Sequence, residues 1–458
     1  MASMQRDYDV IVIGGGGAGL SAATTAADRG ARVLLVDAAD KVGGSTALSG
    51  GVFWAAETSV QRALGVTDSV ADQFRYYMNV NQHKLEPALV QRLCADGAST
   101  LEWLQSLGVE FRSEDLYRAG ADGMLRGHRA YGHGAAIAEA LEGSLSGKSV
   151  DVVTNTRIRQ LYFEKGSVSG IISDGTTVHS GAVVIATGGF GKSPQFLNEL
   201  YPDAAKHGDL AWYIGSPHAQ GDGLFMGRAV GAELVGHNRG LLLLTTGFVR
   251  ELEPYLPPWL IYLNESGRRF IDERTEYSVL AAVLKEQPGG TCQAIFDDAA
   301  RRNSKSPPSS TWSTERLDEF VARGLIIKAE SLVELAARLG MPAATLVTTI
   351  TNYNADCAAG HDSRFFKAPE CLQPVLTPPF YAAPIYPAVV CWTGTGLRID
   401  REARVLNAAD QPIPGLYAAG ETTGGMFGEC YAAGGASIAN AIIFGRTAGV
   451  NAAEWAAA

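Results

Sequence analysis

The chain has 458 residues, which is enough for two or three domains. Apolar residues make up 46% of it and charged residues 19%, a composition typical of a well-packed globular protein rather than a disordered one. Its 38 basic and 48 acidic residues give a net charge of −10, which argues against nucleic-acid binding and against a polybasic membrane surface.

The cysteines, the start of the chain and the apolar runs bear on its compartment. The six cysteines are scattered without a C-x-x-C pair, so we expect neither a metal site nor a disulfide framework. We therefore also expect the protein to reside in a reducing compartment. The start MASMQRDYDV has no signal-peptide pattern, and the apolar run at 240–249 is far shorter than the ~20 residues that span a bilayer. We therefore expect a cytoplasmic protein with no membrane span and no nucleic-acid partner.

Residues 9–40 have the pattern of a strand, a glycine-rich turn, a helix and a second strand. The apolar run at 10–13 predicts a buried parallel strand, residues 20–29 a helix of small side chains, and ARVLLV (31–36) the next strand. The strand ends directly before Asp37. This order predicts a βαβ unit.

The turn in this unit carries a dinucleotide-binding signature, in which Gly14, Gly16 and Gly19 form G-x-G-x-x-G. The first glycine permits the tight turn, the second lets backbone amides reach a pyrophosphate, and the third allows close contact between helix and strand. The helix N-terminus adds partial positive charge for the phosphates. Asp37 can accept hydrogen bonds from a ribose hydroxyl, which favours FAD or NAD over NADP.

Three further segments favour FAD over NAD. The loop KVGGSTALSGGVFWAA (41–56) is rich in glycine and small hydroxyl residues, and two more strand-plus-glycine segments follow at 181–191 and 413–425. With these motifs the chain resembles the fumarate reductase/succinate dehydrogenase flavoprotein superfamily, which binds FAD across a discontinuous Rossmann-like domain.

The resemblance implies a set of FAD-binding residues. Glu421 would hold the second ribose or the ribityl chain. No histidine lies in 41–56, where covalently flavinylated relatives carry one, so we expect non-covalent FAD. The full set is Gly14, Gly16, Gly17, Ala18, Gly19, Asp37, Gly43, Gly44, Ser45, Thr46, Gly50, Gly51, Ala186, Thr187, Gly188, Gly420, Glu421, Ser437 and Ile438.

We expect an α/β fold with two domains. Residues 1–235 and 376–458 would form the FAD-binding domain, with a small antiparallel insert within 150–189. Residues 236–375 would form a smaller α+β cap, in which 331–340 and 342–360 have helical periodicity. The active site would lie at the junction of the two domains.

Three positions separate this chain from the dicarboxylate reductases of the superfamily. Tyr277, in NESGRRFIDERTEYSVL, stands where those relatives have a proton-donating arginine. Ala432 stands where a substrate-clamping arginine is expected. Trp392 and Thr393 occupy the place of a histidine. These differences argue against dicarboxylate reduction.

The same segments resemble the 3-ketosteroid 1-dehydrogenases, which desaturate ketones. The similar stretches are YAAGGASI (431–438), GGSTALSGG (43–51) and PFYAAPIYP (379–387), although this chain is shorter than the usual steroid enzymes. The resemblance points to an α,β-desaturation of a cyclic ketone. A small cyclohexanone-type ring, an oxo-cyclohexane carboxylate and a 3-ketosteroid all satisfy the chemistry.

Such a reaction needs a stabilised carbonyl oxygen, a base and a hydride acceptor. The Tyr431 hydroxyl and the Gly435 N–H would bind the carbonyl oxygen at the start of a helix near 436. Tyr277 is the candidate base. Because a free tyrosine has a pKa near 10, it needs a hydrogen-bonding neighbour, for which Tyr117 or Tyr131 is a candidate.

Two alternatives stay open. The same flavin chemistry run in the opposite direction would make the chain an enoate or enone reductase. A protein of a different class, a non-catalytic flavin-binding redox sensor, would not need tyrosines over the flavin. For the desaturase, the electron acceptor could be a quinone, a dye-like carrier or O₂.

Overall fold

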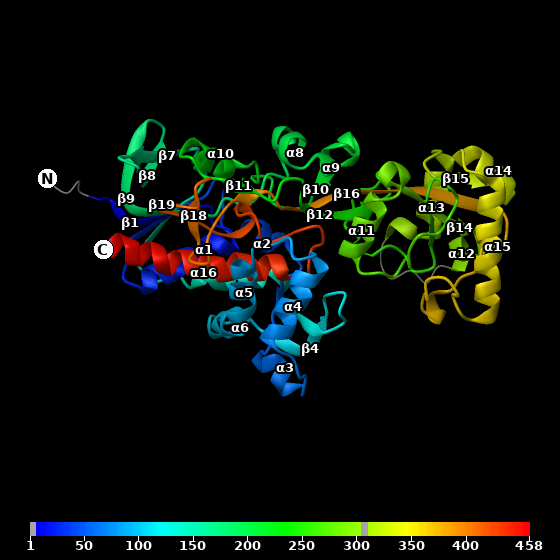
Figure 1. Ribbon diagram of the computed structural model, residues 1–458, viewed down its shortest axis with the longest axis horizontal. Coiled ribbons are helices and arrows are strands. Elements are labelled where there is room, and N and C mark those ends of the chain that lie inside the picture. Colours follow the sequence, from blue (N-terminus) through cyan, green and yellow to red (C-terminus); the bar gives the residue numbers. More distant parts are fainter. Residues whose placement is uncertain (1–5, 254, 304–309) are drawn as a thin grey trace. The chain divides into compact units, whose positions relative to one another are not determined.

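The computed structural model describes residues 6–253, 255–303 and 310–458. The chain forms two compact units (Figure 1). The first comprises Met1–Ala205, Gly215–Leu241 and Cys391–Ala458, and the second comprises Lys206–Ile214 and Leu242–Val390. Both units contain helices and strands, so the predicted α/β fold class is confirmed. The division at 236 and 375 into a cofactor domain and a cap stays a prediction.

An eight-stranded sheet forms the core of the first unit. Its order is β18-β19-β9-β1-β2-β6, and β8 pairs with both β9 and β7. The strands from β19 to β6 run parallel, whereas β7, β8 and β18 pair antiparallel. Both predicted strands of the βαβ unit and the antiparallel insert are confirmed. The bounds are β1 (Tyr8–Ile13), β2 (Val33–Val36), β6 (Val150–Val153), β7 (Gln160–Glu164), β8 (Ser167–Ser173), β9 (Thr176–Ile185), β18 (Arg404–Leu406) and β19 (Pro412–Ala418).

Two helices, α1 (Gly17–Asp28) and α16 (Ala436–Ala457), pack against each other at backbone distance (Figure 1). A Cβ at Gly445 would overlap the carbonyl oxygen of Ala18, and a Cβ at Gly449 would overlap that of Ala22. The contact therefore needs glycine at both positions. The predicted helix at 20–29 starts three residues earlier than expected, at Gly17, and the helix expected near 436 is confirmed.

Shorter helices and two small sheets complete the first unit. Strands β3 (Val52–Trp54) and β4 (Phe111–Arg118) pair antiparallel with β5 (Leu125–Ala130), and β11 (Leu234–Val235) pairs with β17 (Gly396–Leu397). The helices are α2 (Gly44–Leu48), α3 (Ser59–Ala63), α4 (Val70–Val80), α5 (Pro87–Ala95), α6 (Gly97–Ser106), α7 (His133–Gly143), α8 (Pro194–Leu200), α9 (Pro202–Ala205) and α10 (Asp222–Ala229).

Strand β5 carries two buried polar side chains. Arg126 forms a bidentate ion pair with Asp68, with N–O distances of 2.6 and 2.8 Å, and a further ion pair with Asp122 at 2.6 Å. The Nδ1 of His128 faces the carbonyl oxygens of Phe53 and Arg126 and therefore carries the proton, so that Nε2 accepts a hydrogen bond from the Thr58 hydroxyl at 2.8 Å. Burial lowers the pKa of His128 to about 4, so the imidazole is neutral at pH 7.

The second unit is built on a six-stranded sheet with β10-β16-β14-β13 as its main path, while β12 and β15 also pair with β16. The predicted helices at 331–340 and 342–360 are confirmed as α14 and α15. The strands are β10 (Trp212–Tyr213), β12 (Gly240–Thr245), β13 (Ile261–Leu263), β14 (Cys292–Asp297), β15 (Ile327–Ala329) and β16 (Phe380–Thr393). The helices are α11 (Tyr277–Lys285), α12 (Asp298–Asn303), α13 (Thr314–Ala322), α14 (Leu332–Leu339) and α15 (Ala343–Ala359).

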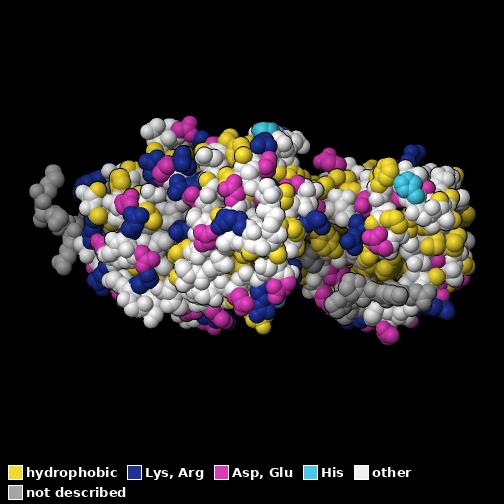
Figure 2. All heavy atoms as spheres, turned by 90° about the horizontal axis from the view of Figure 1, so that it is seen from below, with side chains coloured by type: hydrophobic (Ala, Val, Ile, Leu, Met, Phe, Trp, Pro, Cys, Tyr) yellow, Lys and Arg dark blue, Asp and Glu magenta, His cyan; other side chains and the backbone are white. Residues whose placement is uncertain are grey.

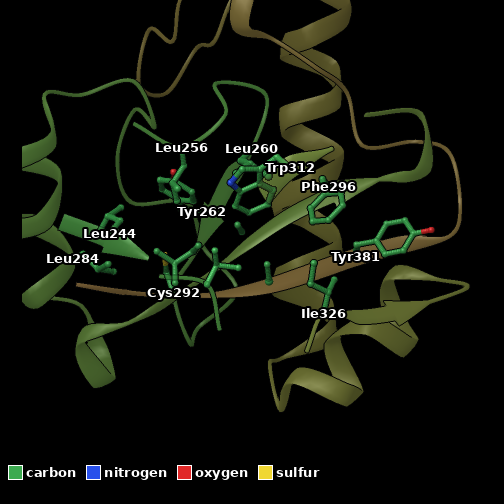
Figure 3. Packing of buried hydrophobic residues seen from close by; sticks show 14 of the residues in the cluster. Leu244, Leu256, Leu260, Tyr262, Leu284, Cys292, Phe296, Trp312, Ile326 and Tyr381 are labelled. Atoms are coloured by element: carbon green, nitrogen blue, oxygen red, sulfur yellow. The ribbon is translucent and has the colours of Figure 1, made fainter. Parts of the chain in front are cut away.

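One core cluster of this unit contains aromatic rings in specific contact with one another (Figure 3). Phe296 on β14 stacks on Tyr381 of β16 with ring centroids 5.2 Å apart and planes 14° apart. Trp312 meets Phe296 edge-on at 6.3 Å. Offset stacking and edge-to-face contacts are the preferred arrangements of aromatic pairs, so these rings add specific packing to the area that they bury.

A buried network of four charges ties together distant parts of the second unit. Arg269 forms two hydrogen bonds to Glu273, both at 3.0 Å, and two to Asp362, at 3.2 and 3.0 Å. Lys367 Nζ donates to Glu273 Oε2 at 3.0 Å and to the Leu260 carbonyl at 2.8 Å. Burial alone would raise the pKa of Glu273. The nearby charges and hydrogen bonds of Lys367 and Arg269 lower it by more, so the pKa lies below its ordinary value. The two cations and two anions compensate each other.

Charged side chains of both signs are mixed over the face seen in Figure 2. The ion pairs Arg75–Asp72 and Arg323–Glu319 are exposed. Among the described residues, no helix has the length and apolar character needed to cross a membrane.

Replacing Lys367 by Met should strongly destabilise the fold. The substitution leaves Glu273 and Asp362 buried with Arg269 as their one remaining cation in the network, and removing one member of a buried ion pair costs about 3–5 kcal/mol. The free energy of unfolding in urea measures the loss. The matched control is Arg323→Ala, which breaks an exposed pair and should cost less than about 1 kcal/mol. Equal losses in the two variants would contradict the role given to Lys367.

The neutral state of His128 should make folding stability sensitive to acid. The pKa of His128 is 6.5 in an unfolded chain and about 4 in the folded protein. Between these two pH values the imidazole is protonated in the unfolded chain and neutral in the folded protein. Stability should therefore be complete above pH 6.5 and fall as the pH drops towards 4, by up to about 3 kcal/mol from this residue. The measurement compares wild type with His128→Gln across this range. Parallel stability curves would rule out the effect.

Candidate functional site

Three neighbouring parallel strands, β19, β9 and β1, end at one edge of the first unit's sheet. Their registers pair Ile13 with Ile185, and Ile185 with Ala418. The segments that follow these strand ends contain most of the predicted cofactor residues, and ligands of such sheets bind outside the carboxyl ends of the strands. These residues are Gly14, Gly16, Gly17, Ala18 and Gly19 after β1, Ala186, Thr187 and Gly188 after β9, and Gly420 and Glu421 after β19.

The remaining predicted cofactor residues belong to the first unit as well. Gly43, Gly44, Ser45 and Thr46 lie at the start of α2, Gly50 and Gly51 precede β3, and Ser437 and Ile438 lie in the first turn of α16. Two hydrogen bonds fasten the 41–56 segment to the glycine turn. Gly17 N–H donates to Thr46 Oγ1 at 3.1 Å, and Gly43 N–H donates to the Gly15 carbonyl at 2.7 Å.

Asp37 holds the glycine turn in shape. Its carboxylate accepts hydrogen bonds from the backbone N–H groups of Gly15 and of Ala39, the latter at 2.7 Å. Since each carboxylate oxygen has two acceptor sites, these bonds leave room for a ligand hydroxyl. The role of Asp37 as a ribose acceptor stays a prediction.

The space around Gly16 shows whether a dinucleotide can approach this turn. It precedes α1 in an extended conformation, with φ −74°. No described protein atom lies within 4 Å of where a Cβ would stand on Gly16. The space next to the helix N-terminus is therefore open on the side where phosphates bind in such turns. These residues fit FAD.

Glu421 is buried and held by a partner that the sequence did not reveal. Thr393 donates to Glu421 Oε1 through its N–H at 2.9 Å and through its hydroxyl at 2.8 Å. Close packing continues beside it, because a Cβ at Gly189 would overlap this carboxylate. Thr393 stands at the position noted for a missing histidine, and no sequence pattern linked it to Glu421.

Tyr431 places its phenol against the first turn of α16. Ser437 N–H donates to the phenol oxygen at 2.8 Å, and the Tyr431 hydroxyl donates to Ser437 Oγ at 2.8 Å. The N-cap residue, Gly435, has φ +94° and no side chain to cap the helix. The phenol oxygen thus satisfies an amide that an N-cap side chain usually satisfies. The expected use of the Tyr431 hydroxyl and the Gly435 N–H as two donors to a carbonyl oxygen stays a prediction.

The surroundings of Tyr431 keep it neutral and fixed. Burial raises the pKa of the Tyr431 phenol; the hydrogen bonds with Ser437 lower it, and the net direction is upward. Its ring stacks on Phe427 with centroids 5.2 Å apart and planes 13° apart. Trp392 meets the other ring of this pair, Phe427, edge-on at 4.8 Å. Tyr431 is therefore suited to donate a hydrogen bond rather than to accept a proton.

Of the three other candidate tyrosines, Tyr131 is exposed, and Tyr117 and Tyr277 lie in different units. Tyr117, on β4, lies close enough to Tyr431 to influence its pKa, and Arg129 lies over the Tyr117 ring at 5.1 Å. Tyr277 is the first residue of α11 in the second unit, where its ring meets that of Tyr255 edge-on at 5.5 Å. The assistance of Tyr117 to a Tyr277 base stays a prediction.

Glu276, next to Tyr277, was not singled out from the sequence. It caps α11, because its Oε2 accepts a hydrogen bond from Ser278 N–H at 2.9 Å. Burial raises the pKa of this carboxyl. No sequence signal indicated this cap, because the residues preferred at an N-cap are serine, threonine, aspartate and asparagine.

Comparison with known proteins identifies the family. A family model described as an FAD binding domain matches residues 9–438. The chain belongs to this family. It is 33% identical over 470 residues to a fumarate reductase (cytochrome) of Shewanella frigidimarina, with 99% of this chain and 79% of that protein covered.

Two further matches are to proteins named as ketosteroid dehydrogenases. The chain is 26% identical over 566 residues to a 3-oxosteroid 1-dehydrogenase of Mycolicibacterium smegmatis, with 99% and 98% covered. The solved structure of a 3-ketosteroid-Δ4-(5α)-dehydrogenase from Rhodococcus jostii RHA1 matches with a TM-score of 0.82 at 24% identity, over 99% of this chain and 98% of that one. This structural match shows that the two chains share a fold. The family resemblance expected from the sequence is confirmed, and the chain is an FAD-dependent oxidoreductase.

Replacing Gly16 by Ala should weaken FAD binding in this flavoprotein without unfolding it. The backbone conformation suits alanine and the added methyl meets no protein atom, but it fills the space next to the helix N-terminus. We expect the affinity for FAD to fall on the order of tenfold or more, measured by titrating the apoprotein with FAD.

Gly143→Ala is the matched control, since its Cβ also meets nothing and Gly143 is the last residue of α7. It should bind FAD as wild type does and be no less stable. Equal FAD affinities for the two variants would contradict the assignment of Gly16.

Proposed function

We propose that this flavoprotein desaturates a cyclic ketone, introducing a C=C bond α,β to its carbonyl. The substrate would be a small cyclohexanone-type ring, an oxo-cyclohexane carboxylate or a 3-ketosteroid. The observation that carries the proposal is the Tyr431 phenol, buried and hydrogen-bonded at the N-terminus of α16. A neutral phenol at a positive helix end is suited to stabilise negative charge that develops on a carbonyl oxygen.

Each proposed residue has one task. The Tyr431 hydroxyl and the Gly435 N–H hold the carbonyl oxygen as it becomes enolate-like, which makes the α-proton acidic enough to leave. Tyr277, ionised to its phenolate with the assistance of Tyr117, accepts that proton. When FAD is bound, it supplies the acceptor for the hydride from the β-carbon.

Other features of the proposal follow from the sequence. FAD would be held non-covalently by the residues of the glycine turn and the first turn of α16, because no histidine lies in 41–56. The electrons would leave to a quinone, a dye-like carrier or O₂. A cytoplasmic location is part of the same proposal.

A reductase of enoates or enones is the second candidate function. It is favoured by the 33% identity to a fumarate reductase. The residues argue against it: Tyr277, Ala432 and Trp392 stand where that chemistry calls for two arginines and a histidine. A clamp for two carboxylates needs such cations, because hydrogen bonds to charged groups are about twice as strong as neutral ones.

The decisive experiment mixes the holoenzyme anaerobically with a 3-ketosteroid, with cyclohexanone and with 4-oxocyclohexanecarboxylate, and follows flavin absorbance. We expect at least one ketone to bleach the flavin. Reduction of fumarate by the dye-reduced enzyme, with no bleaching by any ketone, would overturn the proposal in favour of the reductase.

Tyrosine-to-phenylalanine variants test the assigned roles with the bleaching ketone. Tyr431→Phe should slow bleaching on the order of 10²–10³-fold, as expected for loss of one oxyanion donor, and Tyr277→Phe should slow it as well. Both should keep FAD. Tyr162→Phe is the control, because that hydroxyl donates to Glu164 on β7, at 3.0 Å, and has no part in the proposed site, so its loss should leave the rate unchanged. Wild-type rates in both test variants would refute the roles.

A further inference from the structure

The hydroxyl of Tyr431 has one hydrogen, and in this structure that hydrogen is directed at Ser437 Oγ. The phenol oxygen also accepts a hydrogen bond from Ser437 N–H at 2.8 Å. Ser437 thus contacts the phenol twice, once through its backbone and once through its side chain. A carbonyl oxygen that accepts a hydrogen bond from the Tyr431 hydroxyl therefore has to replace Ser437 Oγ as its acceptor.

The ring of Tyr431 cannot turn away to serve a ligand. It is buried and stacks on Phe427 at 5.2 Å with nearly parallel planes. The backbone next to it is also fixed, since the Tyr76 hydroxyl donates to the Ala432 carbonyl at 2.7 Å. Rotation of the O–H bond is therefore the motion left to the phenol for presenting its hydrogen to a ligand.

Rotation of this bond changes what the Ser437 hydroxyl can do. While Tyr431 donates to it, Ser437 Oγ is an acceptor. Once the phenol hydrogen points to a carbonyl, the phenol oxygen has a lone pair free, and the Ser437 hydroxyl can donate to it. Hydrogen bonds in such a chain polarise one another, so the donor at its end becomes stronger.

We propose that Ser437 is a positioning residue for Tyr431. When the Tyr431 hydroxyl binds an enolate-like oxygen, the Ser437 hydroxyl changes from acceptor to donor and thereby makes Tyr431 a stronger hydrogen-bond donor. The inference rests on the proposed function of Tyr431. It gives Ser437 a task beyond contact with FAD. The direction in which Ser437 acts on the phenol agrees with it, since both of its hydrogen bonds lower the pKa of Tyr431 against the effect of burial.

A double-mutant cycle on the holoenzyme tests the proposal. Ser437→Ala removes the hydroxyl but keeps the N–H, and should slow flavin bleaching by the active ketone about five- to tenfold, the effect of one neutral hydrogen bond. In a Tyr431→Phe background the same change should have less than about a twofold effect, because Ser437 acts through the phenol. Ser437→Thr, which retains the hydroxyl, should restore most of the rate.

A binding measurement makes the test independent of turnover. The probe is 4-nitrophenol, whose phenolate carries negative charge on the oxygen of a flat six-membered ring and reports its ionisation by absorbance. Wild type should bind the phenolate several-fold more tightly than Ser437→Ala, and this difference should vanish in the Tyr431→Phe background. FAD content is checked in every variant. If Ser437→Ala loses FAD, Ser437→Cys replaces it, since a thiol is a weak hydrogen-bonding group of similar size.

The outcomes separate the two proposals. Bleaching by a ketone with a non-additive cycle supports both. No bleaching by any ketone, together with a non-additive cycle in nitrophenolate binding, overturns the ketone desaturase but supports the role of Ser437. A Ser437→Ala effect of equal size in both backgrounds, or no effect in either measurement, overturns the role of Ser437.

Discussion

The approach of α1 and α16 to backbone contact is the constraint on which the first unit depends. Ala18 faces Gly445 and Ala22 faces Gly449, so the two helices run in the same direction. Their amide ends consequently point the same way, and each carries partial positive charge. Two positive ends in one unit are favourable when anions bind there, which a dinucleotide cofactor supplies through its phosphates. Side chains at either glycine would force the helices apart.

The start of α16 shows how the chain assigns different tasks to its helix ends. At α1 the N-cap is Gly16, beside which the space is open, so that end is left to a ligand. At α16 the N-cap is also glycine, but Tyr431 reaches over it and takes one amide. In the proposed mechanism, the second helix end acts on a ligand through this phenol, whose hydrogen can change direction. A charged arginine in the neighbouring position, now Ala432, would have changed both the field and the space.

The sequence was informative where function depends on neighbours along the chain. The glycine turn, its flanking strand and helix, and the apolar run of α16 follow from short-range patterns, and the structure confirms them. The contacts of Thr393 with Glu421 span 28 residues, and no periodicity connects the two. The pairing of Tyr431 with Ser437 is close in sequence, but it depends on the left-handed conformation of Gly435, which directs the chain back towards the phenol. Such pairings need the tertiary structure.

The buried charges of the second unit have a consequence for the integrity of its sheet. Arg269 and Glu273 stand before α11, whereas Asp362 and Lys367 follow α15, so the network joins the two ends of a long stretch of the chain. That stretch supplies β14, which pairs with both β13 and β16, and also β15. Four charges thus close a loop of chain that carries a central strand of the sheet, so that ionic contacts at its base and strand pairing at its middle depend on the same fold.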